Sequence, residues 1–276
     1  MKYSLMDSGN EQKLERFGDY VIVRPSSQAI WKPELAKNKW DEADALFTRD
    51  DGNRWIMRKK LPPTWTVEIE GLRFKLAPTD FGHLGIFPEH SNLWKEFVPL
   101  IQNEKRVCNV LNLFAYSGGA SLAAAKAGAK VCHLDASQGM VAWARENAAL
   151  NKLEGAPIRW IVDDVIKFLG REIKRNVRYD GIILDPPSFG RGSQGEVFKI
   201  ERDLPIILEM CRALLSDAPL FVILSSHTPG FTPLVMHHLL AQSMPKGKIE
   251  QGEMVVHAET GFDLPSGNYA MWKSHV

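Results

Sequence analysis

The pattern of hydrophobic and polar positions changes near residue 104 of this chain. From there on, short apolar runs alternate with longer segments whose apolar residues recur at helical spacing. Such alternation predicts an α/β fold, with a mostly parallel, doubly wound sheet and helices on both faces. The expected strands cover residues 107–114, 130–135, 158–162, 179–184 and 219–224, and the expected helices begin near residues 119, 138, 165, 204 (with Pro205 in the first turn) and 233.

The end of the chain has a different pattern. Residues 248–258 and 269–273 are typical of two strands, and only the loop of residues 259–268 joins them. A parallel pair would need a longer crossover connection, so we expect these strands to form an antiparallel pair at one edge of the sheet.

The part before residue 104 is rich in short β-type runs. Residues 20–23, 54–57, 65–69 and 74–77 alternate with turn signals, which predicts a small antiparallel domain over residues 1–77, with a loose tail up to about residue 12. Residues 78–103 form a connector that ends in a short helix, and its loop is either a plain linker or a segment lying over a cofactor. Residues 104–276 form the expected catalytic domain.

Composition and charge exclude several classes of protein. The 276 residues are 45% apolar with a net charge of +1, which allows a substantial core and excludes a uniformly basic nucleic-acid-binding coat. Cys108, Cys132 and Cys211 are too widely spaced for a zinc site, so we expect a reducing compartment. The chain shows neither a signal peptide nor a membrane span, so we expect a cytoplasmic protein.

Four tryptophans lie among basic residues of the first domain, and the sequence leaves their role open. Aromatic side chains between Lys and Arg can stack on nucleic-acid bases. They can equally fill the core of a small β domain. The residues concerned are Trp31, Trp40, Trp55 and Trp65.

Residues 107–135 predict a strand, a tight glycine turn, a helix closed by Gly128 and a second strand that ends in Asp135. An adenosine-containing ligand needs a turn without obstructing side chains and an acceptor for its ribose hydroxyls. Gly118, Gly119 and Asp135 meet both needs. The third glycine of a dinucleotide-binding turn is absent, which favours S-adenosylmethionine, a ligand without a pyrophosphate.

Carboxylates follow the next two predicted strands. Asp163 and Asp164 end the third strand, where one could accept the adenine amino group and Asp164 could cap the next helix. Asp185 follows the fourth strand within Asp-Pro-Pro-Ser-Phe. The two prolines make this turn rigid, so it would aim the Asp185 carboxylate into the crevice at the strand ends. Phe189 would then offer a stacking face.

The motifs Asn112-Leu-Phe-Ala-Tyr-Ser-Gly-Gly119, Asp135, Asp163-Asp164 and Asp185-Pro-Pro-Ser-Phe189 resemble the class I S-adenosylmethionine-dependent methyltransferases, in particular those that methylate bases of large-subunit ribosomal RNA. This resemblance implies a Rossmann-like seven-stranded sheet with an antiparallel last strand, S-adenosylmethionine as cofactor and no metal. It also implies an acceptor site of Asp185, Pro186, Pro187, Ser188 and Phe189. The expected cofactor-binding residues are Phe87, Phe114, Ala115, Tyr116, Ser117, Gly118, Gly119, Asp135, Ala136, Ser137, Asp163, Asp164, Val165 and Asp185.

One departure from that family changes the expected acceptor. Members that methylate carbon 5 of cytosine use a cysteine nucleophile after the fifth strand, where this chain has Leu224-Ser-Ser-His-Thr228. Without a thiolate the ring carbon is a poor nucleophile, which favours a base nitrogen of RNA. Ser225 and His227 could touch the acceptor or be plain turn residues. Residues 1–77 do not match the PUA domain that many relatives carry.

Three other functions stay open from the sequence. A methyltransferase of this type could act on a protein side-chain amide or on a small molecule. A nicotinamide-dependent oxidoreductase has a similar sheet, although the glycine spacing disfavours it. An RNA-binding module without cofactor turnover would retain RNA binding alone. We expect RNA as the partner and no membrane, and the sequence does not give the oligomeric state.

Overall fold

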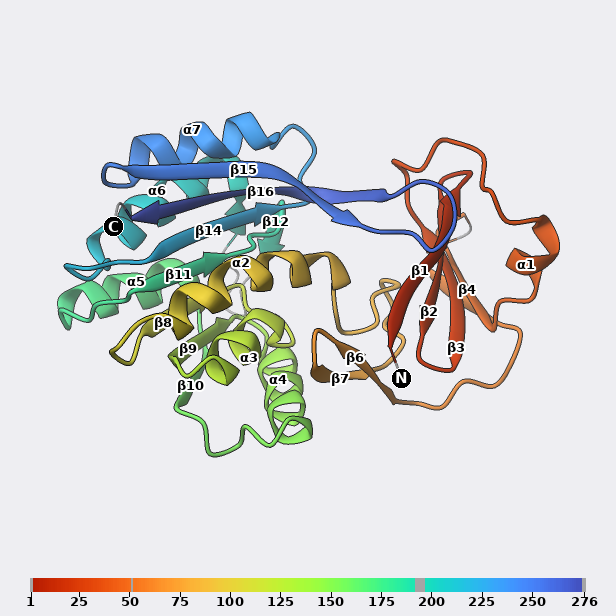
Figure 1. Ribbon diagram of the computed structural model, residues 1–276, viewed down its shortest axis with the longest axis horizontal. Coiled ribbons are helices and arrows are strands. Elements are labelled where there is room, and N and C mark those ends of the chain that lie inside the picture. Colours follow the sequence, from red (N-terminus) through yellow and green to blue (C-terminus); the bar gives the residue numbers. More distant parts are fainter. Residues whose placement is uncertain (1, 51, 192–196, 275–276) are drawn as a thin grey trace. The chain divides into compact units, whose positions relative to one another are not determined.

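The computed structural model describes residues 2–50, 52–191 and 197–274 (Figure 1). Its chain divides into two compact units, Met1–Ser91 with Val255–Ser266 and Asn92–Met254 with Gly267–Val276. The first unit therefore extends past the expected limit at residue 77. It also includes the tip of the C-terminal hairpin, which the sequence pattern assigns to the second domain.

The second unit contains a seven-stranded sheet with the order β10-β9-β8-β11-β14-β16-β15 (Figure 1). Its first five strands in that order are parallel, and β16 runs antiparallel to β14, as the family resemblance implies for the last strand. The strands are β8 (Asn109–Leu113), β9 (Lys130–Asp135), β10 (Ile158–Val162), β11 (Gly181–Leu184), β14 (Phe221–Ser226), β15 (Gly247–Val256) and β16 (Leu264–Ser274), and a separate hairpin joins β12 (Phe189–Arg191) to β13 (Val197–Lys199).

Helices cover both faces of this sheet, because successive strand residues point to opposite sides. One core cluster joins α5, α6 and α7 to strand side chains that include Leu111, Cys132, Ile182 and Val222. The neighbouring strand positions point the other way, and Phe221 stacks on Phe97 of α2 at 5.5 Å between ring centroids. The helices are α2 (Ser91–Gln102), α3 (Gly119–Lys126), α4 (Gln138–Leu150), α5 (Val165–Lys174), α6 (Ile200–Ala213) and α7 (Pro233–Ser243). Among the described residues, no helix has the length and apolarity that a membrane crossing requires.

Helix α6 corrects one prediction, because it begins at Ile200 rather than near Leu204. Pro205 therefore lies inside the helix and not in its first turn. The earlier start is explained by two contacts that the sequence pattern hides. Ile200 is fully buried, and Asp203 Oδ2 accepts a hydrogen bond of 2.8 Å from the backbone amide of Lys199.

The first unit contains a five-stranded sheet with the order β1-β2-β3-β4-β5 and a two-stranded sheet of β6 and β7. The expected antiparallel arrangement is wrong at one place, because β3 and β4 pair in parallel. A parallel pair needs a longer connection, and α1 lies within it. The elements are β1 (Tyr3–Gly9), β2 (Gln12–Phe17), β3 (Tyr20–Pro25), α1 (Lys37–Asp41), β4 (Ala45–Thr48), β5 (Arg54–Met57), β6 (Trp65–Ile69), β7 (Leu72–Leu76) and the 3₁₀ helix η1 (Pro88–His90).

The prediction of a loose tail before residue 12 is wrong, because these residues form the β1–β2 hairpin. Asn10 and Glu11 at its turn have φ values of 50° and 60°, the left-handed conformation that tight hairpins require. Buried polar groups obscure the strand pattern of this segment. Glu15 is fully buried, and its carboxylate accepts a hydrogen bond of 2.7 Å from Arg24 Nε.

The four tryptophans of the first unit contribute to its packing. Trp40 belongs to a core cluster and is only 9% exposed. Each of the other three indole groups donates a hydrogen bond to a backbone carbonyl oxygen of the same unit: Trp31 to Ser8 at 2.9 Å, Trp55 to Thr79 at 2.8 Å and Trp65 to Phe17 at 3.2 Å. These contacts favour the core interpretation over base stacking.

Candidate functional site

The carboxyl ends of the parallel strands lie level with one another in the second unit. Leu113 at the end of β8 pairs with Leu134 of β9 and with Leu184 of β11, and Leu184 pairs in turn with Leu224 of β14. The turns that follow these strands therefore meet at one edge of the sheet, where open α/β sheets bind ligands. This edge brings together the predicted residues of four turns. Phe87 belongs to the first unit, and its role stays a prediction.

The turn after β8 has a backbone that favours glycine. Phe114, Tyr116 and Gly118 have φ values of 54°, 50° and 92°, and bulky residues rarely adopt the first two. The strained turn is held by hydrogen bonds of 3.0 Å from the amide of Ala115 to Leu134 O and from the amide of Gly118 to Ala115 O. A Cβ atom at Gly118 would lie 3.0 Å from the Cβ of Ala144, so this position has little room for a side chain.

Buried polar side chains support this turn from below, and the sequence analysis missed them. Asn147 is fully buried on α4 and donates a hydrogen bond of 2.9 Å to the carbonyl oxygen of Ser117. Ser121 Oγ lies 2.9 Å from both Asn112 Nδ2 and His133 Nδ1. Burial lowers the pKa of His133 to about 3, so this imidazole is neutral at physiological pH.

Asp135, at the end of β9, accepts backbone hydrogen bonds from both sides. Its Oδ2 accepts a hydrogen bond of 2.8 Å from the amide of Tyr116, and its Oδ1 accepts one of 2.9 Å from the amide of Ser137. Burial raises the pKa of Asp135, and these two N–H groups oppose that shift. Ser137 also caps α4 as predicted, because its hydroxyl accepts from the amide of Met140 at 3.3 Å, while Ala136 is exposed.

Asp164 is the N-cap of α5, as predicted. Its Oδ1 accepts a hydrogen bond of 2.9 Å from the amide of Lys167, and Val165 after it is buried. Asp163 accepts a hydrogen bond of 2.8 Å from the amide of Asp164 and forms an ion pair with Arg171. The cap hydrogen bond involves Oδ1 of Asp164 and does not test a contact of Oδ2. The contact between Asp164 and adenine therefore stays a prediction.

The turn after β11 is joined to the end of β14. Ser225 Oγ donates a hydrogen bond of 2.7 Å to Asp185 Oδ1, and Ser188 Oγ lies 2.8 Å from Thr228 Oγ1. Within the turn, Pro186 is buried and Pro187 is exposed. Phe189 is 52% exposed at the start of β12, which leaves much of its ring open to a ligand.

The three cysteines all lie away from these strand ends. Cys108 precedes β8 at its amino end, Cys132 lies within β9, and Cys211 is fully buried on α6. Burial raises the pKa of the Cys132 thiol to about 11 and raises the pKa of Cys211 further. A thiolate nucleophile is therefore not available from these residues.

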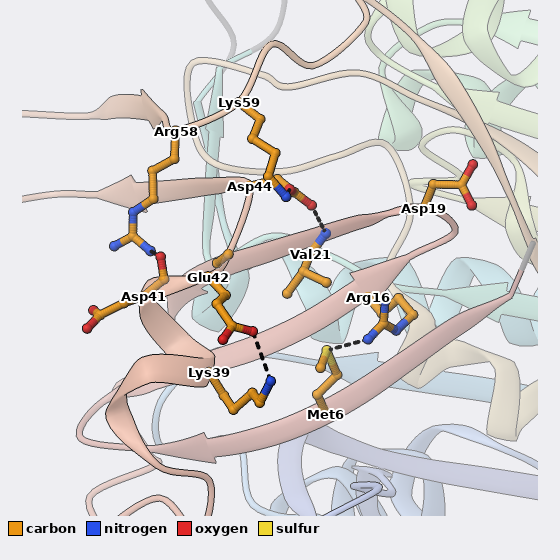
Figure 2. Close-up of a pocket in the computed structure, with 11 residues that line it drawn as sticks. Met6, Arg16, Asp19, Val21, Lys39, Asp41, Glu42, Asp44, Arg58 and Lys59 are labelled. Atoms are coloured by element: carbon orange, nitrogen blue, oxygen red, sulfur yellow. Dashed lines mark hydrogen bonds and ion pairs between the residues drawn. The ribbon is translucent and has the colours of Figure 1, made fainter.

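A separate cavity of about 580 Å³ lies in the first unit, between α1 and the five-stranded sheet (Figure 2). Its lining has four basic and four acidic side chains, and two pairs of them are ion pairs. Lys39 Nζ lies 3.0 Å from a carboxylate oxygen of Glu42, and Lys59 Nζ lies 2.6 Å from Asp44 Oδ1 (Figure 2). This balance of charge gives the cavity no evident ligand chemistry, so the strand ends of the second unit remain the candidate site.

Comparison with known proteins gives a family match over most of the chain. Residues 39–234 match the family model described as S-adenosylmethionine-dependent methyltransferase. The crystal structure of the S-adenosylmethionine-dependent methyltransferase from Agrobacterium tumefaciens is 40% identical and has a TM-score of 0.96. That match covers 100% of this chain and 91% of the other.

Similar proteins include ribosomal RNA large subunit methyltransferases K/L. The protein of Shewanella baltica (strain OS155) is 36% identical over 74% of this chain. The protein of Pseudoalteromonas atlantica is 40% identical over 69% of this chain. The matched regions cover only 30% and 29% of those relatives, so the chain spans less than a third of their length.

Proposed function

The chain belongs to the S-adenosylmethionine-dependent methyltransferases, and from that premise we propose that it methylates a base nitrogen in RNA, with ribosomal RNA as the substrate. The names of the relatives support RNA as the substrate class. The absence of a cysteine from the end of β14 supports nitrogen over a ring carbon.

The residues at the strand ends fit S-adenosylmethionine by their chemistry. An adenosine group needs acceptors for its ribose hydroxyls and its amino group, and Asp135 and Asp164 supply carboxylates at neighbouring strand tips. Gly118 lets the turn between these strand tips pack closely against Ala144 of α4. When bound, the cofactor supplies a methyl group that its sulfonium already activates.

The chain itself then has to bind the acceptor, align it and exclude water. The Asp185 carboxylate would accept a hydrogen bond from an N–H of the acceptor and so orient the nitrogen lone pair toward the methyl group. Phe189 would stack on the base, which requires a nucleotide that is single-stranded or flipped out of its helix. One observation carries this proposal: the exposed Phe189 ring follows, within four residues, a carboxylate held at 2.7 Å by Ser225.

Methyl transfer to a protein amide or a small molecule remains an alternative, because an Asp-Pro-Pro turn can present either. An RNA-binding module without cofactor turnover is the other alternative. The nicotinamide-dependent oxidoreductase is set aside by the family match. The cytoplasmic location and the RNA partner stay predictions.

The test is methyl transfer from labelled S-adenosylmethionine into separate ribosomal RNA and protein fractions of a strain lacking the gene. We expect label in the large-subunit RNA. Mass spectrometry should find the labelled nucleoside methylated in the wild-type strain and unmethylated in the strain that lacks the gene. Asp185→Ala should abolish transfer and keep S-adenosylhomocysteine binding. Label confined to protein would contradict the RNA proposal, and full activity of Asp185→Ala would contradict the acceptor site.

A further inference from the structure

Two hydroxyl contacts join the turn after β11 to the end of β14 and to the turn that follows it. Ser225 bonds Asp185, and Ser188 contacts Thr228, so that each contact joins residues 40 positions apart. The contacts lie on either side of Pro186-Pro187. The proline pair is thus held at one end by a hydroxyl group of β14 and at the other by a hydroxyl group of the turn after β14.

The β14 side of these contacts is firmly anchored. Ser225 is only 2% exposed and lies in β14, which pairs with β11 on one side and with β16 on the other. Thr228 is 8% exposed, and its amide donates a hydrogen bond of 3.1 Å to Ser226 Oγ. The hydroxyl groups of Ser225 and Thr228 therefore project from a buried and hydrogen-bonded part of the fold.

The turn after β11 needs such an anchor. Its prolines restrict their own φ angles, but they do not determine how the Asp185 carboxylate rotates about its side-chain bonds. A hydroxyl donor at 2.7 Å selects one rotation, and a hydrogen bond to a carboxylate is stronger than one between neutral groups.

We infer that Ser225 and Thr228 are positioning residues for methyl transfer, which fix the direction of the Asp185 carboxylate and of the Pro186-Pro187-Ser188 turn. This inference rests on the proposed function, because it takes Asp185 as the group that touches the acceptor. Ser225 acts through Asp185. Its contribution is alignment, which should appear in the rate of methyl transfer and not in cofactor affinity.

The experiment compares Ser225→Ala with the wild type, using ribosomal RNA as acceptor. We expect the kcat of Ser225→Ala to fall about tenfold or more, since small misplacements of reacting groups are costly in rate. The Kd for S-adenosylhomocysteine should stay unchanged. Thr228→Val should also lower kcat, and Thr228→Ser, which keeps the hydroxyl, should restore most of it.

Ser216→Ala, in the connection between α6 and β14, is a matched control. Ser216 Oγ donates a hydrogen bond of 2.6 Å to Asp180 Oδ1, which likewise joins a serine to an aspartate, but at the amino end of β11. We expect this variant to keep the wild-type kcat.

Hydrogen exchange gives a readout that does not depend on the acceptor. In Ser225→Ala the amides of Ser188 and Phe189 should exchange faster than in the wild type, and in Ser216→Ala they should not. An unchanged kcat together with unchanged exchange in Ser225→Ala would overturn the inference. An equal loss of kcat in Ser216→Ala would overturn it too, because the effect would then be general. Full activity of Asp185→Ala would instead contradict the acceptor site of the proposed function, and label confined to protein would contradict its RNA substrate.

Discussion

The backbone amide of Tyr116 donates a hydrogen bond of 2.8 Å to Asp135 Oδ2, and this bond ties the turn after β8 to the tip of β9. The same carboxylate accepts from the amide of Ser137 at 2.9 Å. Asp135 therefore holds the shape of the turn, in addition to its proposed contact with the ribose.

Asp135→Ala should weaken cofactor binding more than a lost ribose contact alone would. Hydrogen bonds to charged groups contribute about 1.5–3 kcal/mol, which corresponds to a Kd for S-adenosylhomocysteine raised roughly 10- to 150-fold. Asp135→Asn should be less affected, because its amide oxygen still accepts one backbone hydrogen bond. Calorimetric titration measures both, with exposed Asp217→Ala as control. Wild-type affinity in Asp135→Ala would refute the role of Asp135 in the cofactor site.

A comparison of Gly118→Ala with Gly128→Ala distinguishes the cost of a strained backbone from the cost of a steric clash at the added Cβ atom. Both glycines have positive φ, 92° and 98°, so each alanine should cost about 1–2 kcal/mol of stability. Only Gly118 lacks room for a Cβ atom, since nothing lies within 4 Å of that position at Gly128. Gly118→Ala should therefore have the lower Tm and be the only one with weakened S-adenosylhomocysteine binding. Equal effects of the two variants on Tm and on binding would refute the steric argument.

Two substitutions at Asp164 separate its cap from its proposed adenine contact. Asp164→Ala removes the side-chain acceptor for the amide of Lys167, at a cost of about 1 kcal/mol. Asp164→Ser keeps a cap but removes the carboxylate. We expect Asp164→Ser to unfold at nearly the wild-type temperature and still bind S-adenosylhomocysteine more weakly. If Asp164→Ser bound S-adenosylhomocysteine with unchanged affinity, Asp164 would cap the helix and would not contact adenine.

His133 should make the protein sensitive to acid. Its pKa is lowered by burial from 6.5 to about 3, so between these pH values the unfolded chain binds a proton at this residue that the folded protein does not. Stability from this residue is therefore present above pH 6.5 and falls as the pH drops toward 3, by up to about 1.4 kcal/mol per pH unit.

Denaturant unfolding of His133→Asn at several pH values tests this expectation. The stability of this variant should fall less steeply below pH 6.5 than that of the wild type. His238→Asn, at an exposed position of α7, should keep the wild-type slope. If the stability of His133→Asn fell with pH as steeply as that of the wild type, the buried imidazole would not be the cause of the acid sensitivity.

The fold of the second unit was predictable because its signals are local. Gly128 does adopt the left-handed conformation that ends α3, and Ser137 does cap α4. The β1–β2 hairpin was missed because its buried Glu15 depends on Arg24 in the next strand. No local pattern shows such a pairing.

The candidate site was predictable at the level of turns but not of contacts. The carboxylates after β9, β10 and β11 were expected at one edge because parallel strands share that edge. The bond between Ser225 and Asp185 requires β14 to lie beside β11, and the two residues are 40 positions apart. Asn147 was missed because a buried amide on a helix resembles an ordinary polar position.

The chain passes between its two units three times: after Ser91, after Met254 and after Ser266. The returning segment supplies Val256 and Leu264 to a core cluster with Leu5 and Ala29. A gene fragment that ends at residue 91 would encode a unit with part of its interior missing. An exchange of residues 2–91 alone would therefore leave this core incomplete unless residues 255–266 were exchanged with them.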